Sequence, residues 1–371
     1  MESSQKVVDE FCNIPRDIIF RILKDFPVKN LLTLRCVSKL WCSIIDDPLF
    51  VQIHHIQSHT RPEAINLLLR YEKQNSCLYS LHPEGGLASY ILTLLDKEIS
   101  TPFQSINGLV CIENSIYNPS TREFKTLPRL RVNVPCDVTT TKVTTPVDVS
   151  TKFFLGLDPS TSKYKVLALC RLFSNASEHA QVQFKILTLG TNLWREIDTS
   201  ELRLDIPQLY MAYAKGYCIA DVIYITSKGD SKDVIIAFEV GSEKFRIIRL
   251  PDGANTETCF VIQVNEHLAL IDGRISAIWI LEDYEKQLWS RQSLVVPRYC
   301  PSCDVVHCFI PVGTIHTGEI LFRCATSELF YYNLETKALR RAWVRSYFGY
   351  DTLSNLCITK HVESLYRLKE M

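Results

Sequence analysis

The chain has 371 residues, of which 46% are hydrophobic, and its 41 Lys and Arg residues are balanced by 41 Asp and Glu residues. This size and apolar content indicate a folded protein with a sizeable core, made either of two or three domains or of one small module and one large domain. The balanced charge argues against a nucleic acid or an anionic membrane as partner, because no excess of basic residues creates an attractive field.

Neither a secretion signal nor a membrane span is recognisable in the sequence. Residues 1–10 lack the apolar core of a signal peptide, and no later run approaches the roughly 18 apolar residues that a membrane-spanning helix needs. The 14 cysteines stand mostly singly within apolar stretches, which is typical of buried thiols in a reducing compartment. We therefore expect the protein in the cytosol, the nucleus or both.

Residues 11–55 predict a small helical module that follows a polar tail at residues 1–10. Pro15 suits the first turn of a helix, since the N–H that it lacks would have no partner there, and Pro27 ends that helix. Ser38 is a suitable N-cap for a helix that ends before residues 46–48, and a further short helix fits between these two. The module is therefore expected to contain three short helices.

Apolar residues recur at helical spacing along this module. Fewer than about 40 to 50 residues rarely sustain a core without disulfides, a metal or a partner, so this apolar surface is expected to dock on something. From spacing alone, packing on the rest of the chain and binding to another protein fit equally well. The residues predicted at a partner surface are Ile14, Pro15, Ile18, Ile22, Leu31, Leu34, Val37 and Trp41.

The order of these residues resembles an F-box, in the form common in plant proteins. The matching pieces are Ile14-Pro15, Ile18, Ile22-Leu23, Pro27-Val28, Leu31, Arg35-Cys36-Val37-Ser38-Lys39, Trp41, and Asp47-Pro48 with Phe50. Ile14 stands where Leu is usual in the family, and Phe26 stands where Leu commonly precedes the Pro. The resemblance implies that the eight surface residues bind a Skp-type adaptor, and through it the cullin and RING subunits of a ubiquitin ligase.

After about residue 60 the sequence changes to short β-type runs separated by turn residues. One unit recurs five times. It consists of a strand, a polar turn and a second strand that begins with a large apolar residue. The steps between these apolar residues are 70, 51, 44 and 50 residues, and the last three fit the roughly 40 to 50 residues of a propeller blade. The recurring residues are Phe124, Trp194, Phe245, Trp289 and Leu339.

This region resembles the F-box-associated interaction domain, a kelch-like β-propeller that follows the F-box in many plant proteins. The matching pieces are Gly108-Leu109-Val110-Cys111, Tyr117-Asn118-Pro119-Ser120-Thr121-Arg122, Gly156-Leu157-Asp158-Pro159 with Tyr164-Lys165-Val166, Trp194-Arg195, Phe238-Glu239-Val240 with Glu243-Lys244-Phe245, and Trp279-Ile280-Leu281-Glu282-Asp283-Tyr284. We therefore predict a small all-α F-box at residues 11–55 and a large all-β, kelch-like propeller at residues 56–371.

Two segments of the β region carry further predictions. Residues 356–359 and 364–367 have the pattern of strands, and a closed ring would pair the end of the chain beside residues 65–69. Residues 132–152 are rich in Thr, Val and Pro and contain no aromatic residue, which predicts a flexible loop, with a regular blade strand as the alternative. This loop, together with a strand pair around Phe154 and Tyr164, explains the long first step of the repeat.

Catalytic motifs are missing from the sequence, which has no Gly-x-Ser-x-Gly, no P-loop, no Gly-x-Gly-x-x-Gly and no His-Glu-x-x-His. The nearest approach to a metal site is Cys300 and Cys303 with His307, Cys308 and His316, whose spacing fits zinc only loosely. A turn whose thiols pack inward is the alternative. We predict no catalytic residue, no cofactor and no metal.

Three classes of function are consistent with these features. The resemblance implies a substrate receptor of a Skp–cullin–F-box ubiquitin ligase, which acts by bringing a target protein close to the enzyme rather than by chemistry of its own. A propeller scaffold that binds an adaptor without causing degradation is the second class. The third is an enzyme, which would need polar groups that converge in the central channel. We predict the first, with a target that the sequence does not name.

Overall fold

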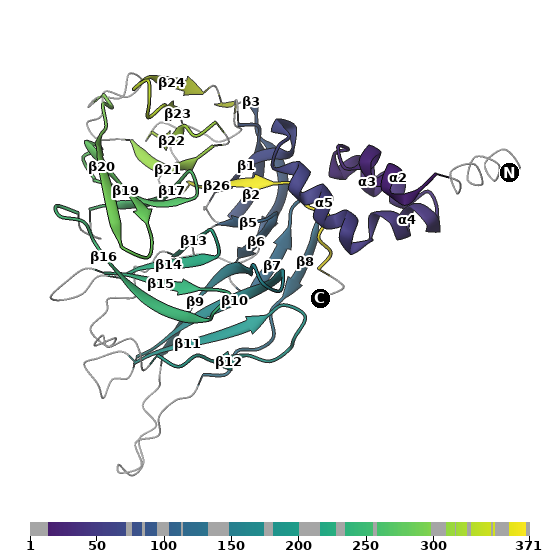
Figure 1. Cartoon of the computed structure of the whole chain (residues 1–371), viewed down its shortest axis with the longest axis horizontal. Coiled ribbons are helices and arrows are strands. Elements are labelled where there is room, and N and C mark those ends of the chain that lie inside the picture. The colour runs from purple at the N-terminus through teal and green to yellow at the C-terminus, as the bar shows by residue number, and fades with distance from the viewer. Residues whose placement is uncertain are drawn as a thin grey trace, which may run out of the picture.

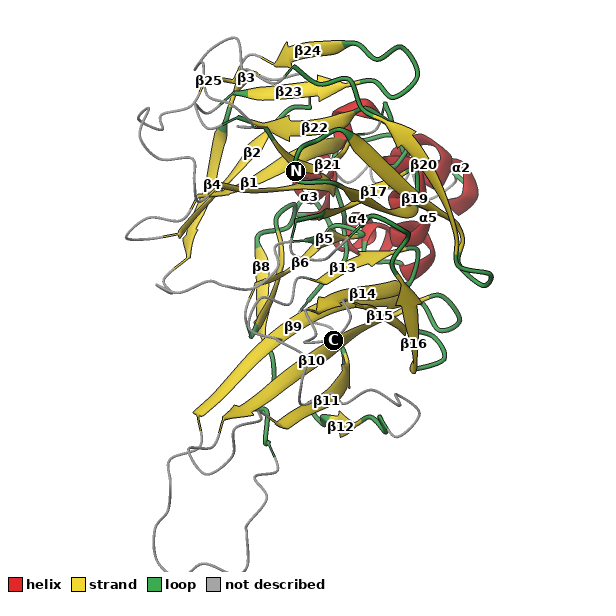
Figure 2. Cartoon of the chain, turned by 90° about the vertical axis from the view of Figure 1, so that its left-hand side faces the viewer, coloured by secondary structure: helices red, strands yellow, loops and turns green. Residues whose placement is uncertain are grey.

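The computed structural model describes residues 14–71, 76–83, 86–94, 104–112, 114–132, 148–173, 181–199, 216–227, 234–254, 258–297, 309–315, 317–324, 328–342, 344–345 and 356–368. It shows a group of short helices against one side of a ring of β-sheets (Figure 1, Figure 2). None of the helices among the described residues has the length and apolar character needed to cross a membrane.

The helical module contains α2 (Arg16–Leu23), α3 (Val28–Arg35), α4 (Lys39–Ile45) and α5 (Pro48–Ser58). The prediction that Ser38 caps a helix is confirmed, because its side chain accepts a hydrogen bond from the Trp41 N–H of α4. The prediction of three helices is wrong, since four are described. Asp47 accepts a hydrogen bond from the Leu49 N–H at 2.9 Å, so the Asp-Pro pair that follows α4 also starts α5.

Six four-stranded sheets form the ring, and we number them blades 1 to 6. In blades 1 to 5 the strands follow one another in chain order, joined by antiparallel hairpins. These strands are β5 (Ser105–Ile106), β6 (Leu109–Ile112), β7 (Ser115–Asn118) and β8 (Glu123–Thr126) in blade 1; β9 (Asp148–Asp158), β10 (Lys163–Phe173), β11 (Gln181–Thr188) and β12 (Arg195–Glu196) in blade 2; β13 (Gly216–Ile219), β14 (Val222–Ser227), β15 (Val234–Glu239) and β16 (Lys244–Arg249) in blade 3; β17 (Phe260–Val264), β18 (His267–Ile271), β19 (Ala277–Asp283) and β20 (Leu288–Ser293) in blade 4; and β21 (Ile310–Thr314), β22 (Ile320–Arg323), β23 (Leu329–Tyr332) and β24 (Leu339–Ala342) in blade 5.

Blade 6 is built from both ends of the ring. It contains β26 (Leu356–Val362), β1 (Ile65–Tyr71), β2 (Ser76–Leu81) and β4 (Ser89–Leu94), and β1 follows the short helix η1 (Pro62–Ala64). β26 pairs antiparallel with β1, with Leu69 opposite Ile358, so the predicted closure beside residues 65–69 is confirmed. A short parallel ladder joins β3 (Gly86–Leu87) to β25 (Val344–Arg345). The prediction of a strand at residues 364–367 is wrong, because these residues belong to no strand.

The predicted repeat corresponds to the third and fourth strands of blades 1 to 5. Four of the five recurring apolar residues lie on the fourth strands, and Trp194 directly precedes β12. The long first step is explained in part by β9 and β10, which have 11 residues each. The predicted loop at residues 132–152 is wrong at its end, since residues 148–152 lie in β9 and pair with β10. Residues 133–147 lie outside the described part of the chain.

Turns of similar chemistry join several of these strands. Each opens on an Asn or Asp whose Oδ1 accepts N–H bonds from the residues two and three positions later, as at Asn118, Asp158 and Asn333. Such side chains replace the backbone partners that a tight turn leaves unsatisfied. A residue with positive φ then leads into the next strand, at Arg122, Ser162 and Lys337.

A separate apolar cluster lies at each contact between neighbouring blades. The six clusters join blades 1 and 2, 2 and 3, 3 and 4, 4 and 5, 5 and 6, and 6 and 1. Each blade therefore depends on its neighbours to bury its apolar surface, and we expect the ring to be stable only when it is closed.

Candidate functional site

The structure separates the eight predicted surface residues into different environments. Ile22 and Val37 have 54% and 64% of their surface exposed, and Pro15 is also exposed. Ile14, Leu34 and Trp41 are half-buried and pack against the core of the module, and Ile18 is also half-buried. The prediction for Leu31 is wrong, because this side chain is 0% exposed within the helical core and offers no free surface.

Three further apolar side chains of the module are exposed but were not among the eight predicted surface residues. Phe26, Leu49 and Ile56 are 37%, 57% and 62% exposed. The spacing of Phe26 after Ile18 and Ile22 does place it on the same apolar stripe, whereas Leu49 and Ile56 lie on the unpredicted α5. Among the described residues, 5 of the 12 exposed large hydrophobic side chains lie in this small module. We call Ile22, Phe26, Val37, Leu49 and Ile56 the exposed apolar set.

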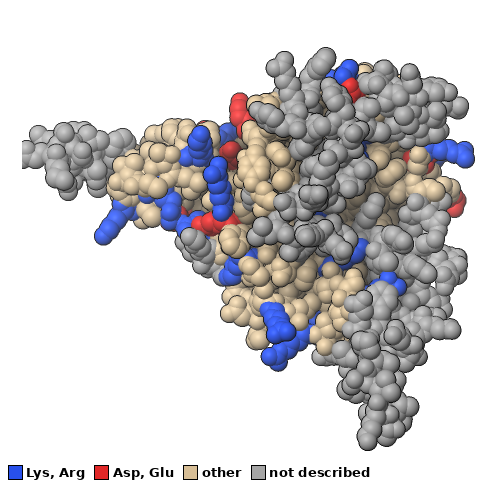
Figure 3. All heavy atoms as spheres, turned by 180° about the vertical axis from the view of Figure 1, so that it is seen from behind, with Lys and Arg blue, Asp and Glu red and all other residues tan. Residues whose placement is uncertain are grey.

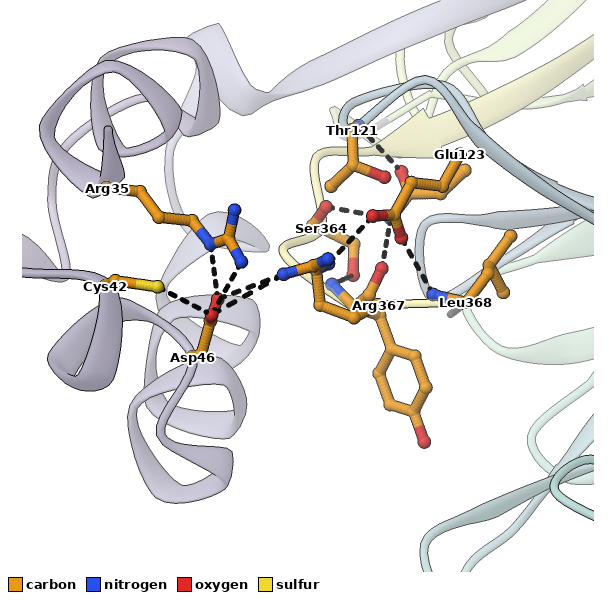
Figure 4. Close-up of polar contacts among 10 residues, drawn as sticks. Arg35, Cys42, Asp46, Thr121, Glu123, Ser364, Arg367 and Leu368 are labelled. Atoms are coloured by element: carbon orange, nitrogen blue, oxygen red, sulfur yellow. Dashed lines mark hydrogen bonds and ion pairs between the residues drawn. The ribbon is translucent and has the colours of Figure 1, made fainter. Parts of the chain in front are cut away.

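Asp46 ties together the two helices that flank Val37, α3 and α4. Arg35 of α3 donates two hydrogen bonds to its carboxylate, at 2.7 and 2.8 Å, and the Cys42 thiol of α4 donates a third at 3.3 Å. Burial raises the pKa of Asp46, but the hydrogen bonds from Arg35 and Cys42 outweigh it and hold the pKa below its usual value. The connection between α3 and α4 is therefore held by a paired charge (Figure 4).

The module projects from the ring, and Lys and Arg side chains are spread over the face seen in Figure 3.

Polar contacts tie together the base of the helical module, where it meets the ring. His54 of α5 donates to the Phe26 carbonyl at 2.8 Å, and Arg61 donates to the Asp25 carbonyl at 2.7 Å. The adjoining part of the ring includes His361 of β26, whose Nδ1 lies 2.9 Å from the Ser105 hydroxyl.

Comparison with known proteins assigns both parts of the chain. Residues 11–52 match the F-box domain, and residues 66–366 match the F-box associated beta propeller domain. The chain belongs to the F-box proteins with an associated beta propeller. The family predicted from the sequence is confirmed, as is the all-α module followed by an all-β propeller.

Similar proteins include several F-box proteins of Arabidopsis thaliana. At1g47790, named as an F-box protein, is 32% identical over 84% of this chain and 79% of its own length. The F-box protein At5g65850 is 28% identical over 100% of this chain and 94% of its own length. Among solved structures, a chain of the nidogen/laminin complex covers 81% of this chain and 99% of its own, at 10% identity and a TM-score of 0.46.

The propeller of this F-box protein encloses a second candidate site, a cavity of about 540 Å³. Residues of β5, β13, β17, β21 and β26 line it, so it is the central channel of the ring. Asp221, Glu266 and Lys360 place charged side chains along it, while Gln104 bonds to both backbone groups of Cys218 at 2.6 Å. The channel therefore contains polar groups and is not a purely apolar plug.

The predicted candidates for a metal site cannot be placed in this channel or elsewhere. Cys300, Cys303, His307, Cys308 and His316 lie outside the described residues. Within the described ranges, no group of three or more His, Cys, Asp or Glu side chains is arranged to hold a metal ion.

Two buried histidines at the base of the F-box predict an acid-sensitive protein. His54 is 0% and His361 4% exposed, and burial lowers the pKa of His54 to about 4 and that of His361 to about 3. The unfolded chain binds protons at these sites below about pH 6.5, whereas the folded chain does not, so stability falls as the pH drops from about 6.5 towards 4. Each histidine contributes a slope of about 1.4 kcal/mol per pH unit to the free energy of unfolding.

Urea unfolding at several pH values between 7 and 4.5 measures this slope. Replacement His54→Asn removes one titrating group, so we expect a shallower fall in stability with acid than in the wild type. Identical slopes in the two proteins would contradict the assignment of His54 as a buried neutral group.

Proposed function

We propose that this F-box protein is the substrate-recognition subunit of a Skp–cullin–F-box ubiquitin ligase. F-box domains generally bind Skp-type adaptors, and the observation that carries the proposal is an F-box with an exposed apolar set that the chain itself does not bury. Through the adaptor it would join the cullin and RING subunits, while the propeller binds a target protein for ubiquitination and degradation.

The proposed mechanism is proximity. Holding a target beside the ubiquitin-loaded conjugating enzyme raises the effective concentration of its lysines, and this needs a binding surface but no nucleophile in the receptor. We therefore propose that the chain is not itself an enzyme. We also propose that it acts in the cytosol or the nucleus, where such ligases meet their targets.

Substitution of the exposed apolar set tests the adaptor contact. A docked aliphatic side chain contributes about 1.5 to 3 kcal/mol to binding, and a carboxylate buried in its place adds a desolvation cost. Ile22→Asp and Val37→Asp should therefore each weaken adaptor binding by at least about 10-fold. The double variant should not be captured by the adaptor in a pull-down. Both positions are exposed, so the F-box should keep its helices. Leu31→Asp is unsuitable, because a charge in the core would unfold the module.

Leu288 offers a matched control for Ile22, since it is also 54% exposed but lies on β20 of the propeller. Leu288→Asp should leave adaptor binding unchanged. Wild-type adaptor binding by the Ile22→Asp, Val37→Asp double variant would refute the proposed interface.

A non-degradative scaffold is the second candidate, because it uses the same two surfaces. Affinity purification with and without inhibition of cullin ligases separates the two. A receptor should accumulate its trapped target only when the ligase is inhibited, whereas the partners of a scaffold should be recovered equally in both conditions.

A further inference from the structure

The six residues that follow β26 lie between the F-box and the propeller. We call residues 363–368 the C-terminal strap. Its odd-numbered side chains contact the F-box. Glu363 accepts a hydrogen bond from the Val28 N–H at 3.2 Å, Leu365 packs within the helical core, and Arg367 lies 3.4 Å from Asp46.

The even-numbered residues of the C-terminal strap contact the propeller. The Ser364 N–H donates to the Ser120 hydroxyl at 3.1 Å, and the Tyr366 ring meets the Tyr164 ring edge to face, with 4.8 Å between centroids. Leu368, which is 1% exposed, packs into the cluster between blades 1 and 2. Residues 363 to 366 of the strap therefore contact the two parts of the protein in turn, as side chains do on opposite sides of an extended chain, whereas Arg367 contacts both parts.

The buried amide of Asn118 holds the backbone of the C-terminal strap on the propeller side. This side chain is 0% exposed, and its Nδ2 donates to the carbonyls of Ser364 and Tyr366 at 3.0 and 2.8 Å. Its Oδ1 meanwhile organises the turn between β7 and β8. One amide therefore fixes a turn of blade 1 and the path of the strap.

On the F-box side, the C-terminal strap completes both the core and a helix terminus. α3 starts after Pro27, which provides no side-chain cap, and the Glu363 carboxylate takes that role for the Val28 N–H. Leu365 is 2% exposed among the buried residues of α2 to α5. The F-box core is thus incomplete without a residue from the far end of the chain.

Arg367 connects two carboxylates that belong to different parts of the protein. Its Nε donates to Glu123 of β8 at 2.8 Å, and its Nη1 approaches Asp46 of the F-box (Figure 4). Glu123 also accepts the Leu368 N–H at 2.9 Å. The Arg367 side chain is 16% exposed, so these charges interact with little screening by solvent.

We propose that the C-terminal strap makes the F-box and the propeller one rigid body, and that Leu365 and Arg367 are positioning residues that set their mutual orientation. Parts of a chain joined by a small interface move relative to one another by default, and a two-sided strap removes that freedom. Its importance for ubiquitin transfer rests on the proposed function, in which the orientation sets the distance from the adaptor to the target.

The orientation can be measured in the full chain without any partner. Spin labels carried by unnatural amino acids at position 21 of α2 and position 244 of β16, both exposed, leave the native cysteines untouched. Pulsed electron paramagnetic resonance should give one narrow distance distribution for the otherwise wild-type chain. The Leu365→Ala, Arg367→Ala double variant should broaden it severalfold, while the propeller keeps a cooperative thermal transition.

Further variants separate positioning from folding. Arg367→Ala leaves the F-box core complete and should broaden the distribution less than the double variant does, and Arg367→Lys should restore part of the order. Arg249→Ala, at an exposed position of β16, is the matched control and should change nothing. A broad distribution in the wild type, or an unchanged width in both Arg367→Ala and the double variant, would overturn the proposal.

The failure of this inference and that of the proposed function are distinguishable. Broadening in the variants of a chain that binds no Skp-type adaptor would refute the receptor function and support the C-terminal strap. Normal adaptor binding by the wild type, together with an unchanged distance distribution in the variants, would support the receptor function and refute the proposed role of the C-terminal strap.

Discussion

A chain that ends at residue 349 should fail to form a cooperatively folded propeller. The deletion removes β26, which pairs along the whole of β1 from Ile65 to Tyr71 and supplies Ile358 to the cluster between blades 5 and 6. It also removes the C-terminal strap from the F-box core and from the cluster between blades 1 and 2. The exposed edge of β1 would then be open to pairing with other chains, and we expect aggregation in gel filtration and no cooperative thermal transition.

A shorter deletion provides the control for this truncation. A chain that ends at residue 368 keeps β26 and every described contact of the C-terminal strap, so it should elute and melt like the wild type. A soluble, cooperatively melting chain of residues 1–349 would show that the sheets form a stable open assembly.

Gly108→Ala should be the most damaging single change in the inner hairpin of blade 1. Gly108 has a φ of +83°, which side chains other than glycine rarely adopt. A Cβ at this position would lie 2.2 Å from the Ser364 Cβ and 2.9 Å from the Val362 carbonyl, so the end of β26 and the C-terminal strap would have to move. Backbone strain alone costs about 1 to 2 kcal/mol, and the displaced contacts add to it, so we expect a loss of several kcal/mol in the free energy of unfolding.

Gly241→Ala is the matched control, because Gly241 has no such φ and its added Cβ would first meet the Pro159 ring at 3.5 Å, an ordinary contact distance. Thermal and urea unfolding of both variants measure the difference. Equal stabilities of the Gly108 and Gly241 variants would show that the strap does not pack against the hairpin as described.

Local sequence patterns predicted the elements that depend on near neighbours in the chain. The Ser38 cap and the turns that open on Asn118 and Asn333 each depend on hydrogen bonds within a few residues. Such chemistry can be recognised in a short window, and its recurrence therefore indicated blades as well as strands. The closure of β26 on β1 was also predictable, since a ring has no other partner for its last strand. The first helix, in contrast, ends at Leu23 rather than at Pro27, which is the N-cap of α3.

The wrong or incomplete predictions came from local sequence patterns that are compatible with two different structures. The helix end predicted before residues 46–48 is confirmed, since α4 ends at Ile45, but Asp47-Pro48 also caps and starts α5, which was not predicted. Residues 148–152 have β-branched side chains but no aromatic residue, and only the 11-residue partner β10 shows that they form a strand. In both cases the local sequence allowed two structures, and packing with distant residues selected one of them.

The sequence by itself determined the helical module, the repeated hairpins and the apolar residues from which a partner surface could be chosen. Only the tertiary structure decided which of those residues stay exposed, and it buried Leu31 while leaving Val37 accessible. The physical reason is that burial depends on what the rest of the chain brings to a site. Leu365 completes the F-box core, and Glu363 caps α3 from 335 residues away, contacts that the local sequence of the F-box cannot encode.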